Sequence, residues 1–224
     1  MKNWSTRKIV LFVAVCVILN VVGKLIVVAL ELPLWADSFG TALCAYLGGP
    51  VCGALAGLTG NLAYCVINRL SAAYSITSIG LGIIVGIAAR YRWFDRFYGF
   101  MKAASLSMLT ALVVSVPINI ILDNGYTGNK WGDGVINYLM DKEWPFFLCC
   151  VLGQLSIEFA DKVLTIAAVY IVILLRRYNR NRNKEKALQQ GSAVGTALIL
   201  CFSLTAAFTV PVKGDAQPSA ETTD

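Results

Sequence analysis

Long apolar stretches, separated by short polar connections, recur along most of the chain. A stretch of about 20 apolar residues has the length that crosses a bilayer as a helix, and a helix satisfies its own backbone polar groups in lipid. We therefore predict seven membrane segments, at residues 9–30, 38–47, 51–67, 74–89, 103–122, 145–175 and 193–210. The second is short for a crossing, and Gly48, Gly49 and Pro50 predict a tight turn between it and the third.

Polar residues inside these segments recur at helical spacing. Residues three, four or seven apart lie on one face of a helix, so each set forms a stripe. The stripes are Asn20 and Lys24 in the first segment, Asn61, Tyr64 and Asn68 in the third, and Ser115, Asn119 and Asp123 in the fifth. Together they predict a polar cavity that opens toward one side of the membrane. For any single residue, an interhelical hydrogen bond, or for Lys24 an outward reach to the membrane surface, is the alternative.

The sixth segment carries Glu158, Asp161 and Lys162 near its middle. Each ionisable residue costs roughly 2.5–3.5 kcal/mol at membrane depth on insertion scales. Glu158 precedes Lys162 by four residues, the favourable order for an ion pair on a helix, and Asp161 lies on nearly the same face. We predict that these side chains form the floor of the polar cavity. An internal ion pair that only holds the bundle together is the alternative.

Composition supports the same fold class, because hydrophobic residues make up 57% of the 224 residues and charged residues only 14%. A soluble domain has about 25% charged residues, so we predict an all-α membrane protein. The seven cysteines lie in apolar segments and histidine is absent, so we expect buried thiols rather than a metal site or disulfides. Without histidine or a phosphate-binding loop, we expect neither an enzyme nor a cofactor.

The basic residues indicate how the chain is oriented. Thirteen of the nineteen Lys and Arg residues fall in residues 1–8, 90–102 and 176–186, which share one side if all seven segments cross. The positive-inside rule places that side and the N-terminus in the cytoplasm, and the C-terminus outside. Basic residues placed in this way favour the lipid bilayer as a partner and argue against nucleic acid.

The outer connection at residues 123–143 is long and rich in glycine and aromatic residues, including Trp131. Connections of this length are often lids, and aromatic rings over a polar cavity suit a flat heterocyclic ligand. For Trp35 and Trp144, a place in the aromatic belt of the membrane interface is an equal alternative.

Several short motifs resemble one protein family. They are LPLWADSFGT at residues 32–41, LGGP at 47–50, GLTGN at 57–61 and EFADK at 158–162. With the helix pattern of residues 9–177, they resemble the substrate-binding S components of energy-coupling factor (ECF) transporters, most closely the riboflavin-type group. The resemblance rests on a pattern rather than on a unique signature. The first segment lacks the small residues, four apart, with which family members often dock their scaffold.

The resemblance implies a compact six-helix bundle in a bacterial cell membrane whose outer half binds a vitamin or similar small molecule. It also implies a membrane scaffold subunit and two cytoplasmic ATPase subunits as partners. The expected parts are an S-component-like bundle at residues 1–177, a basic cytoplasmic linker at 178–192, an appended seventh transmembrane helix at 193–211 and a disordered extracytoplasmic tail at 212–224. The additional helix equally suits a ligand-binding input module of a bacterial sensor, and a structural membrane protein is a third possibility.

For a binding function we expect the ligand's polar contacts from the outer half of the bundle. Lys162 would meet an anionic or carbonyl group, while the carboxylates would accept hydrogen bonds from ligand donors. The predicted contact residues are Asp37, Asn61, Tyr64, Asn68, Asn119, Trp131, Glu158, Asp161 and Lys162.

Overall fold

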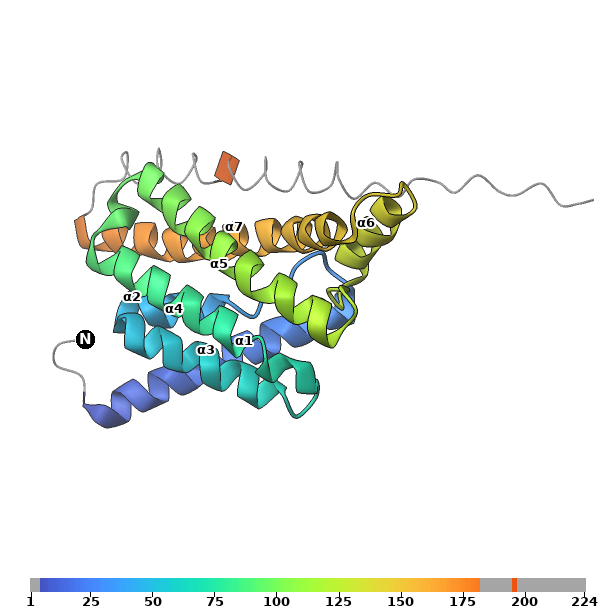
Figure 1. Ribbon diagram of the computed structural model, residues 1–224. Helices are drawn as coiled ribbons and strands as arrows, with labels where there is room; N and C mark the ends of the chain where they lie inside the picture. Colours follow the sequence, from blue (N-terminus) through green and yellow to red (C-terminus); the bar gives the residue numbers. More distant parts are fainter. Residues whose placement is uncertain (1–4, 182–194, 197–224) are drawn as a thin grey trace, which may run out of the picture.

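The computed structural model describes residues 5–181 and 195–196, and every regular element in them is helical (Figure 1). The α-helices are joined by two short 3₁₀ helices, η1 and η2. In chain order the elements are α1 (Thr6–Leu30), α2 (Phe39–Gly48), α3 (Pro50–Tyr64), η1 (Arg69–Ala72), α4 (Ser75–Arg90), η2 (Trp93–Asp95), α5 (Phe97–Leu122), α6 (Lys130–Met140) and α7 (Phe146–Asn181). The all-α prediction is confirmed for these residues.

Six of the predicted segments correspond to α1, α2, α3, α4, α5 and α7. The tight turn is confirmed, since α2 ends at Gly48, Gly49 has φ +88° and α3 starts at Pro50. The third segment was predicted too long, because α3 already ends at Tyr64. The predicted seventh segment, residues 193–210, lies outside the described residues except for residues 195–196, as do most of the predicted linker and the whole tail.

The outer connection was predicted as a loop, and this was wrong for its second half, which forms α6. The side chain of Asn129 caps this helix by accepting a hydrogen bond from the Trp131 N–H at 3.1 Å. Gly132 and Ile136 are buried, and Gly153 of α7 lies directly beneath Ile136. The apolar face of α6 is therefore packed on α7.

Close helix contacts hold the bundle together. A Cβ atom on Gly82 of α4 would lie 2.5 Å from the carbonyl carbon of Gly53 on α3, so the two backbones touch. A larger apolar core fills the half of the bundle near η2, where Phe94, Phe100 and Tyr170 are almost fully buried. The buried ionisable side chains lie in the other half of the bundle.

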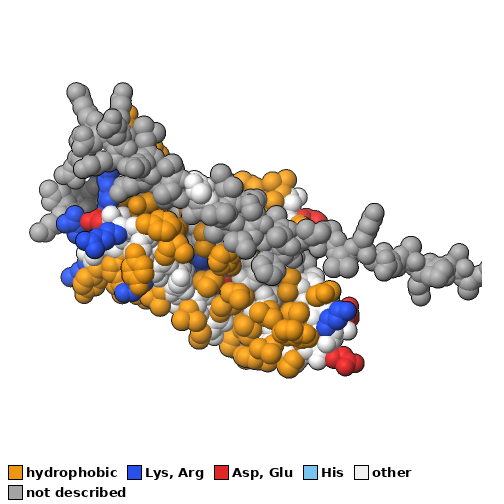
Figure 2. Space-filling view, turned by 90° about the horizontal axis from the view of Figure 1, so that it is seen from above, with side chains coloured by type: hydrophobic (Ala, Val, Ile, Leu, Met, Phe, Trp, Pro, Cys, Tyr) orange, Lys and Arg blue, Asp and Glu red, His pale blue; other side chains and the backbone are white. Residues whose placement is uncertain are grey.

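The outer surface of the bundle is strongly apolar. Val10, Leu11, Val113 and Ile121 are between 63% and 77% exposed. Figure 2 shows hydrophobic side chains over much of the visible surface, with Lys and Arg gathered at one end. Among the described residues, three stretches are long and apolar enough to cross a membrane: α1, Arg69–Arg90 and α5. These features fit an α-helical membrane protein.

The two ends of the bundle differ. The loop between α1 and α2, η1 and α6 lie at one end, which we call the α6 end; η2 and the C-terminal part of α7 lie at the other (Figure 1). At that other end Arg177 forms an ion pair with Asp95. The polar stripes predicted from the sequence all run toward the α6 end.

Candidate ligand site

Lys162 is the centre of a buried polar cluster in the half of the bundle near the α6 end. Its Nζ atom lies 2.6 Å from Asp161 Oδ2 and 3.0 Å from Glu158 Oε2. It also donates a hydrogen bond to Ser38 Oγ at 3.1 Å. All four residues are at most 3% exposed. The predicted pairing of Glu158 with Lys162 is therefore present, and Asp161 is the nearer partner.

Asp161 ties the loop between α1 and α2 to α7. Its Oδ1 atom accepts hydrogen bonds from the backbone N–H groups of Trp35, at 3.2 Å, and Ala36, at 2.7 Å. The Ser38 hydroxyl lies 3.3 Å from the other carboxylate oxygen. Ala36 adopts a positive φ of 50°, which turns the chain so that both amides face the same carboxylate. One buried side chain thus shapes the loop that closes this end of the bundle.

Lys24 of α1 is buried in the same cluster, so the alternative of an outward reach is wrong. Its ammonium lies 3.0 Å from Asp37 Oδ2 and donates to Ser71 Oγ at 3.4 Å. The same ammonium sits 4.8 Å from the ring centre of Tyr64 and 5.6 Å from that of Trp35. Two aromatic rings and one carboxylate therefore surround a single cation.

Asn61 connects this region to α3 and α4. Its side-chain oxygen accepts from the Ser71 hydroxyl at 3.0 Å, and its amide nitrogen donates to Ser78 Oγ at 2.7 Å. On the opposite side, Glu158 Oε1 accepts from the Gln154 amide at 2.9 Å. These contacts extend the cluster in two directions across the bundle.

On the α7 side, the cluster extends to α5 through the amide side chains of Gln154 and Asn119. Gln154 Oε1 accepts from the Asn119 amide at 2.9 Å, and Asn119 Oδ1 accepts from the Tyr74 hydroxyl at 2.6 Å. The polar contacts thus form one continuous chain. It starts at Ser78 of α4, runs through α3, η1, α1 and the loop between α1 and α2 to α7, and continues through α5 to Tyr74. We call this set the polar network. It joins α1, α3, α4, α5 and α7, and it includes no residue of α2 or α6.

A small cavity of about 10 Å³ lies within this region, lined by Asn20, Val21, Lys24, Asp37, Gly60, Asn61 and Tyr64. That volume holds about one water molecule. The wide polar cavity expected from the stripes is therefore not open in this conformation. The reason is physical: the side chains that were expected to face it bond to one another instead.

The structure brings together seven of the nine predicted contact residues: Asp37, Asn61, Tyr64, Asn119, Glu158, Asp161 and Lys162. Asn68 lies apart, because α3 ends four residues earlier; it is exposed and caps η1 by accepting from the Leu70 N–H at 3.0 Å. Trp131 also lies outside the polar network and is 37% exposed.

The predicted contact set left out several members of the polar network: Lys24, Ser38, Ser71, Tyr74 and Gln154. Lys24 and Gln154 were detectable as members of polar helix faces. Ser71 and Tyr74 lie in and beside a short 3₁₀ helix that has no periodic signal in the sequence.

The first turn of α6 covers the loop that Asp161 shapes. The Trp131 indole N–H donates to the Glu31 carbonyl at 2.7 Å, the Asn129 amide donates to the Leu32 carbonyl at 3.1 Å, and Lys130 forms an ion pair with Glu31. These contacts are few and mostly near the surface.

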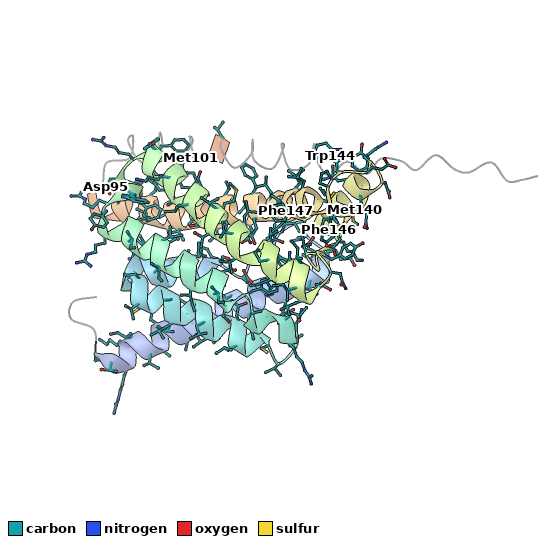
Figure 3. All side chains as sticks on the ribbon, viewed as in Figure 1. Asp95, Met101, Met140, Trp144, Phe146 and Phe147 are labelled. Atoms are coloured by element: carbon teal, nitrogen blue, oxygen red, sulfur yellow. The ribbon has the colours of Figure 1, made fainter. Side chains whose placement is uncertain are left out.

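Exposed aromatic and sulfur-containing side chains gather where α6 joins α7. Met140, Trp144, Phe146 and Phe147 are labelled there in Figure 3 and are 41–59% exposed. Trp at such a position is typical of the membrane–water interface, which fits the expected aromatic belt at Trp144.

The site offers both charged and neutral hydrogen-bonding groups. Ammonium, carboxylate, amide and hydroxyl groups lie side by side, and the described residues contain no group of three acidic, Cys or His side chains arranged to hold a metal ion. A comparison with known protein families, curated proteins and solved structures found no match to this chain.

Proposed function

We propose that this chain is the substrate-binding S component of an ECF-type transporter, which takes up a vitamin or similar small heterocyclic nutrient across a bacterial cell membrane. The observation that carries the proposal is the polar network: five ionisable side chains, buried or nearly so, in one half of an otherwise apolar bundle. The motifs that resemble this family, WADS at residues 35–38 and EFADK at 158–162, supply the residues at its centre.

Energetics support a role in binding. Buried ion pairs contribute little net stability, because desolvation offsets most of their attraction, and apolar residues of similar volume are often as stable or more so. If the bundle needed only to fold, apolar side chains at positions 24, 158 and 162 would stabilise it as well as Lys24, Glu158 and Lys162 do. Intramembrane ionisable groups are typical of sites that recognise a solute.

In this proposal the structure corresponds to the closed, empty form. Lys162 is held by Asp161 and Glu158, and a ligand exchanges its own polar groups for part of these contacts. Entry requires movement of the loop between α1 and α2 and of the first turn of α6, which are joined by the surface contacts of Glu31 with Lys130 and Trp131. The aromatic residues of the α6 end then lie beside the ligand.

The proposed topology follows from the charges. The end that holds η2 and the last turns of α7 faces the cytoplasm, and the α6 end faces outward. In the topology predicted from the sequence, a further crossing at residues 193–210 puts the C-terminus outside. In the proposed transporter two partner ATPases supply the energy through a scaffold subunit, which fits the lack of a phosphate-binding loop in this sequence.

Uptake in cells tests the proposal. Loss of the genomic copy is expected to abolish uptake of one nutrient, and Lys162→Ala or Asn61→Ala in a restoring copy is expected to prevent recovery. Lys142→Ala is the matched control, since it removes a lysine that is exposed at the same end. Purification of the chain together with a scaffold and ATPases is expected. Unchanged uptake in both site variants would exclude the proposal.

Two other functions have specific support. The apolar stretch at residues 193–210 suits a sensor input module, which binds the same ligand but purifies without ATPases. The mutual satisfaction of the polar network and a cavity of only about 10 Å³ favour a structural role. A structural role predicts that no small molecule stabilises the purified protein.

A further inference from the structure

The charges buried in the polar network do not balance. Its five ionisable groups are the carboxylates of Asp37, Glu158 and Asp161 and the ammonium groups of Lys24 and Lys162. With each in its ordinary charged form, the network carries one negative charge in excess. Uncompensated charge in a low-dielectric interior is unfavourable, and it is relieved when a carboxylate takes up a proton or when a counter-charge enters.

The three carboxylates differ in the number of hydrogen-bond donors and ion-pair partners around them. Asp161 accepts from two backbone N–H groups and from Lys162 at 2.6 Å, and Asp37 pairs with Lys24 at 3.0 Å. Glu158 Oε2 accepts no hydrogen bond; Lys162 Nζ lies 3.0 Å away but is not aligned for one. The Glu158 side chain is only 3% exposed. Glu158 is therefore the carboxylate with the fewest hydrogen-bond donors of the three.

The small cavity is lined by the Lys24 ammonium and by groups that contact it. Asn61, Tyr64, Asp37 and Lys24 line it, and the Lys24 ammonium lies against the face of the Tyr64 ring at 4.8 Å, with the Trp35 ring at 5.6 Å on another side. Aromatic faces and a nearby carboxylate are the features that recognise ammonium groups in ligands. A ligand cation in an enlarged cavity would meet the same groups.

The surrounding end of the molecule is acidic as well. Outside the polar network, the described residues at the α6 end include five acidic side chains against three basic ones: Glu31, Asp123, Asp133, Asp141 and Glu143 against Arg69, Lys130 and Lys142. A field of one sign at an entrance raises the local concentration of solutes of the opposite sign.

We infer that the ligand is a small organic cation, with a quaternary or protonated nitrogen that brings the buried charges of the polar network into balance. This inference rests on the proposed binding function and narrows it to one charge class. The nitrogen carries the positive charge, the Tyr64 ring at the cavity contacts its substituents, and the carboxylates supply the opposite charge. Lys162 remains paired with Asp161 and donates a hydrogen bond to any carbonyl oxygen of the ligand.

Matched probe pairs test the inference on the full-length protein in detergent. The first pair is 1-methylnicotinamide and 3-methylbenzamide, which share a flat ring and carboxamide and differ in the ring charge. The second is choline and 3,3-dimethylbutan-1-ol, in which carbon replaces the charged nitrogen. The measurement is the shift in thermal unfolding temperature with probe concentration, compared with the protein alone.

At least one cation is expected to raise the unfolding temperature saturably, while its neutral partner leaves it unchanged. Glu158→Gln is expected to weaken this binding by at least about tenfold, because a buried counter-charge is removed. Glu143→Gln, an exposed acid at the same end, is the control and leaves the affinity unchanged. Equal effects of both members of each pair, or no effect of either cation, would overturn the inference.

The molecule that co-purifies with the protein separates this inference from the proposed function. If mass spectrometry identifies a neutral or anionic molecule whose binding is lost in Lys162→Ala, the binding function stands and the charge assignment falls. If the molecule is a cation and the same variant loses it, both stand.

Discussion

The strongest quantitative prediction concerns the removal of Lys162. Lys162→Met keeps much of the side-chain volume and removes the ammonium that lies between Asp161 and Glu158, at 2.6 Å and 3.0 Å. Glu158→Gln keeps the shape of the carboxylate and removes its charge. The two single variants and the double variant form a cycle that measures how strongly the buried charges depend on one another.

The expected magnitudes follow from the charge count. Lys162→Met leaves three carboxylates with Lys24 as the remaining cation of the network, and we expect a loss of about 3–5 kcal/mol in the free energy of unfolding. Glu158→Gln removes the excess negative charge and keeps the hydrogen bond to Gln154, so we expect a change within about 1 kcal/mol. The double variant is expected to be more stable than the sum of the two predicts, by about 0.5–3 kcal/mol.

Denaturant titration of the protein in mixed micelles, followed by circular dichroism, gives the free energies. Arg92→Met is the matched control, because Arg92 pairs with Asp95 while its own side chain is 83% exposed. Such a surface pair is expected to contribute less than about 1 kcal/mol. A loss in Lys162→Met no larger than that in Arg92→Met would refute the reasoning. So would a Glu158→Gln variant as unstable as Lys162→Met.

Three further predictions concern the packing, the cover and the orientation. Gly40→Ala places a Cβ atom 2.0 Å from the Cys16 carbonyl oxygen and is expected to lower the unfolding temperature strongly, whereas Gly134→Ala, with nothing within 4 Å, is expected to raise it slightly. Trp131→Phe loses one surface hydrogen bond, so we expect stability within about 1 kcal/mol of the original and faster release of bound ligand. Cysteine at position 143 is expected to react with a membrane-impermeant maleimide in intact cells, and cysteine at position 92 only after permeabilisation; the reverse pattern would contradict the orientation.

The features that the sequence predicted well depend on local periodicity. Apolar length located six helices to within a few residues, except that α5 starts earlier than predicted, at Phe97, and α7 continues further, to Asn181. The i,i+4 spacing of Glu158 and Lys162 is a property of a single helix, and the pair forms as expected.

The features that the sequence did not predict depend on tertiary contacts. Lys24 forms an ion pair with Asp37 because the loop turns at Ala36, where φ is positive. Asn68 leaves the expected face because α3 stops at Tyr64. The α6 helix contains Gly132 and Gly134, which favour a loop by local propensity, and it forms where its apolar side packs on α7.

The central claim is that the polar network binds a small molecule, and mass spectrometry of the molecules released from purified protein tests it most directly. One compound is expected to leave the original protein in near-stoichiometric amount and to be missing from Lys162→Ala and Asn61→Ala, while Lys142→Ala retains it. Release of the same compounds from all four proteins, or of none from well-folded original protein, would contradict the claim.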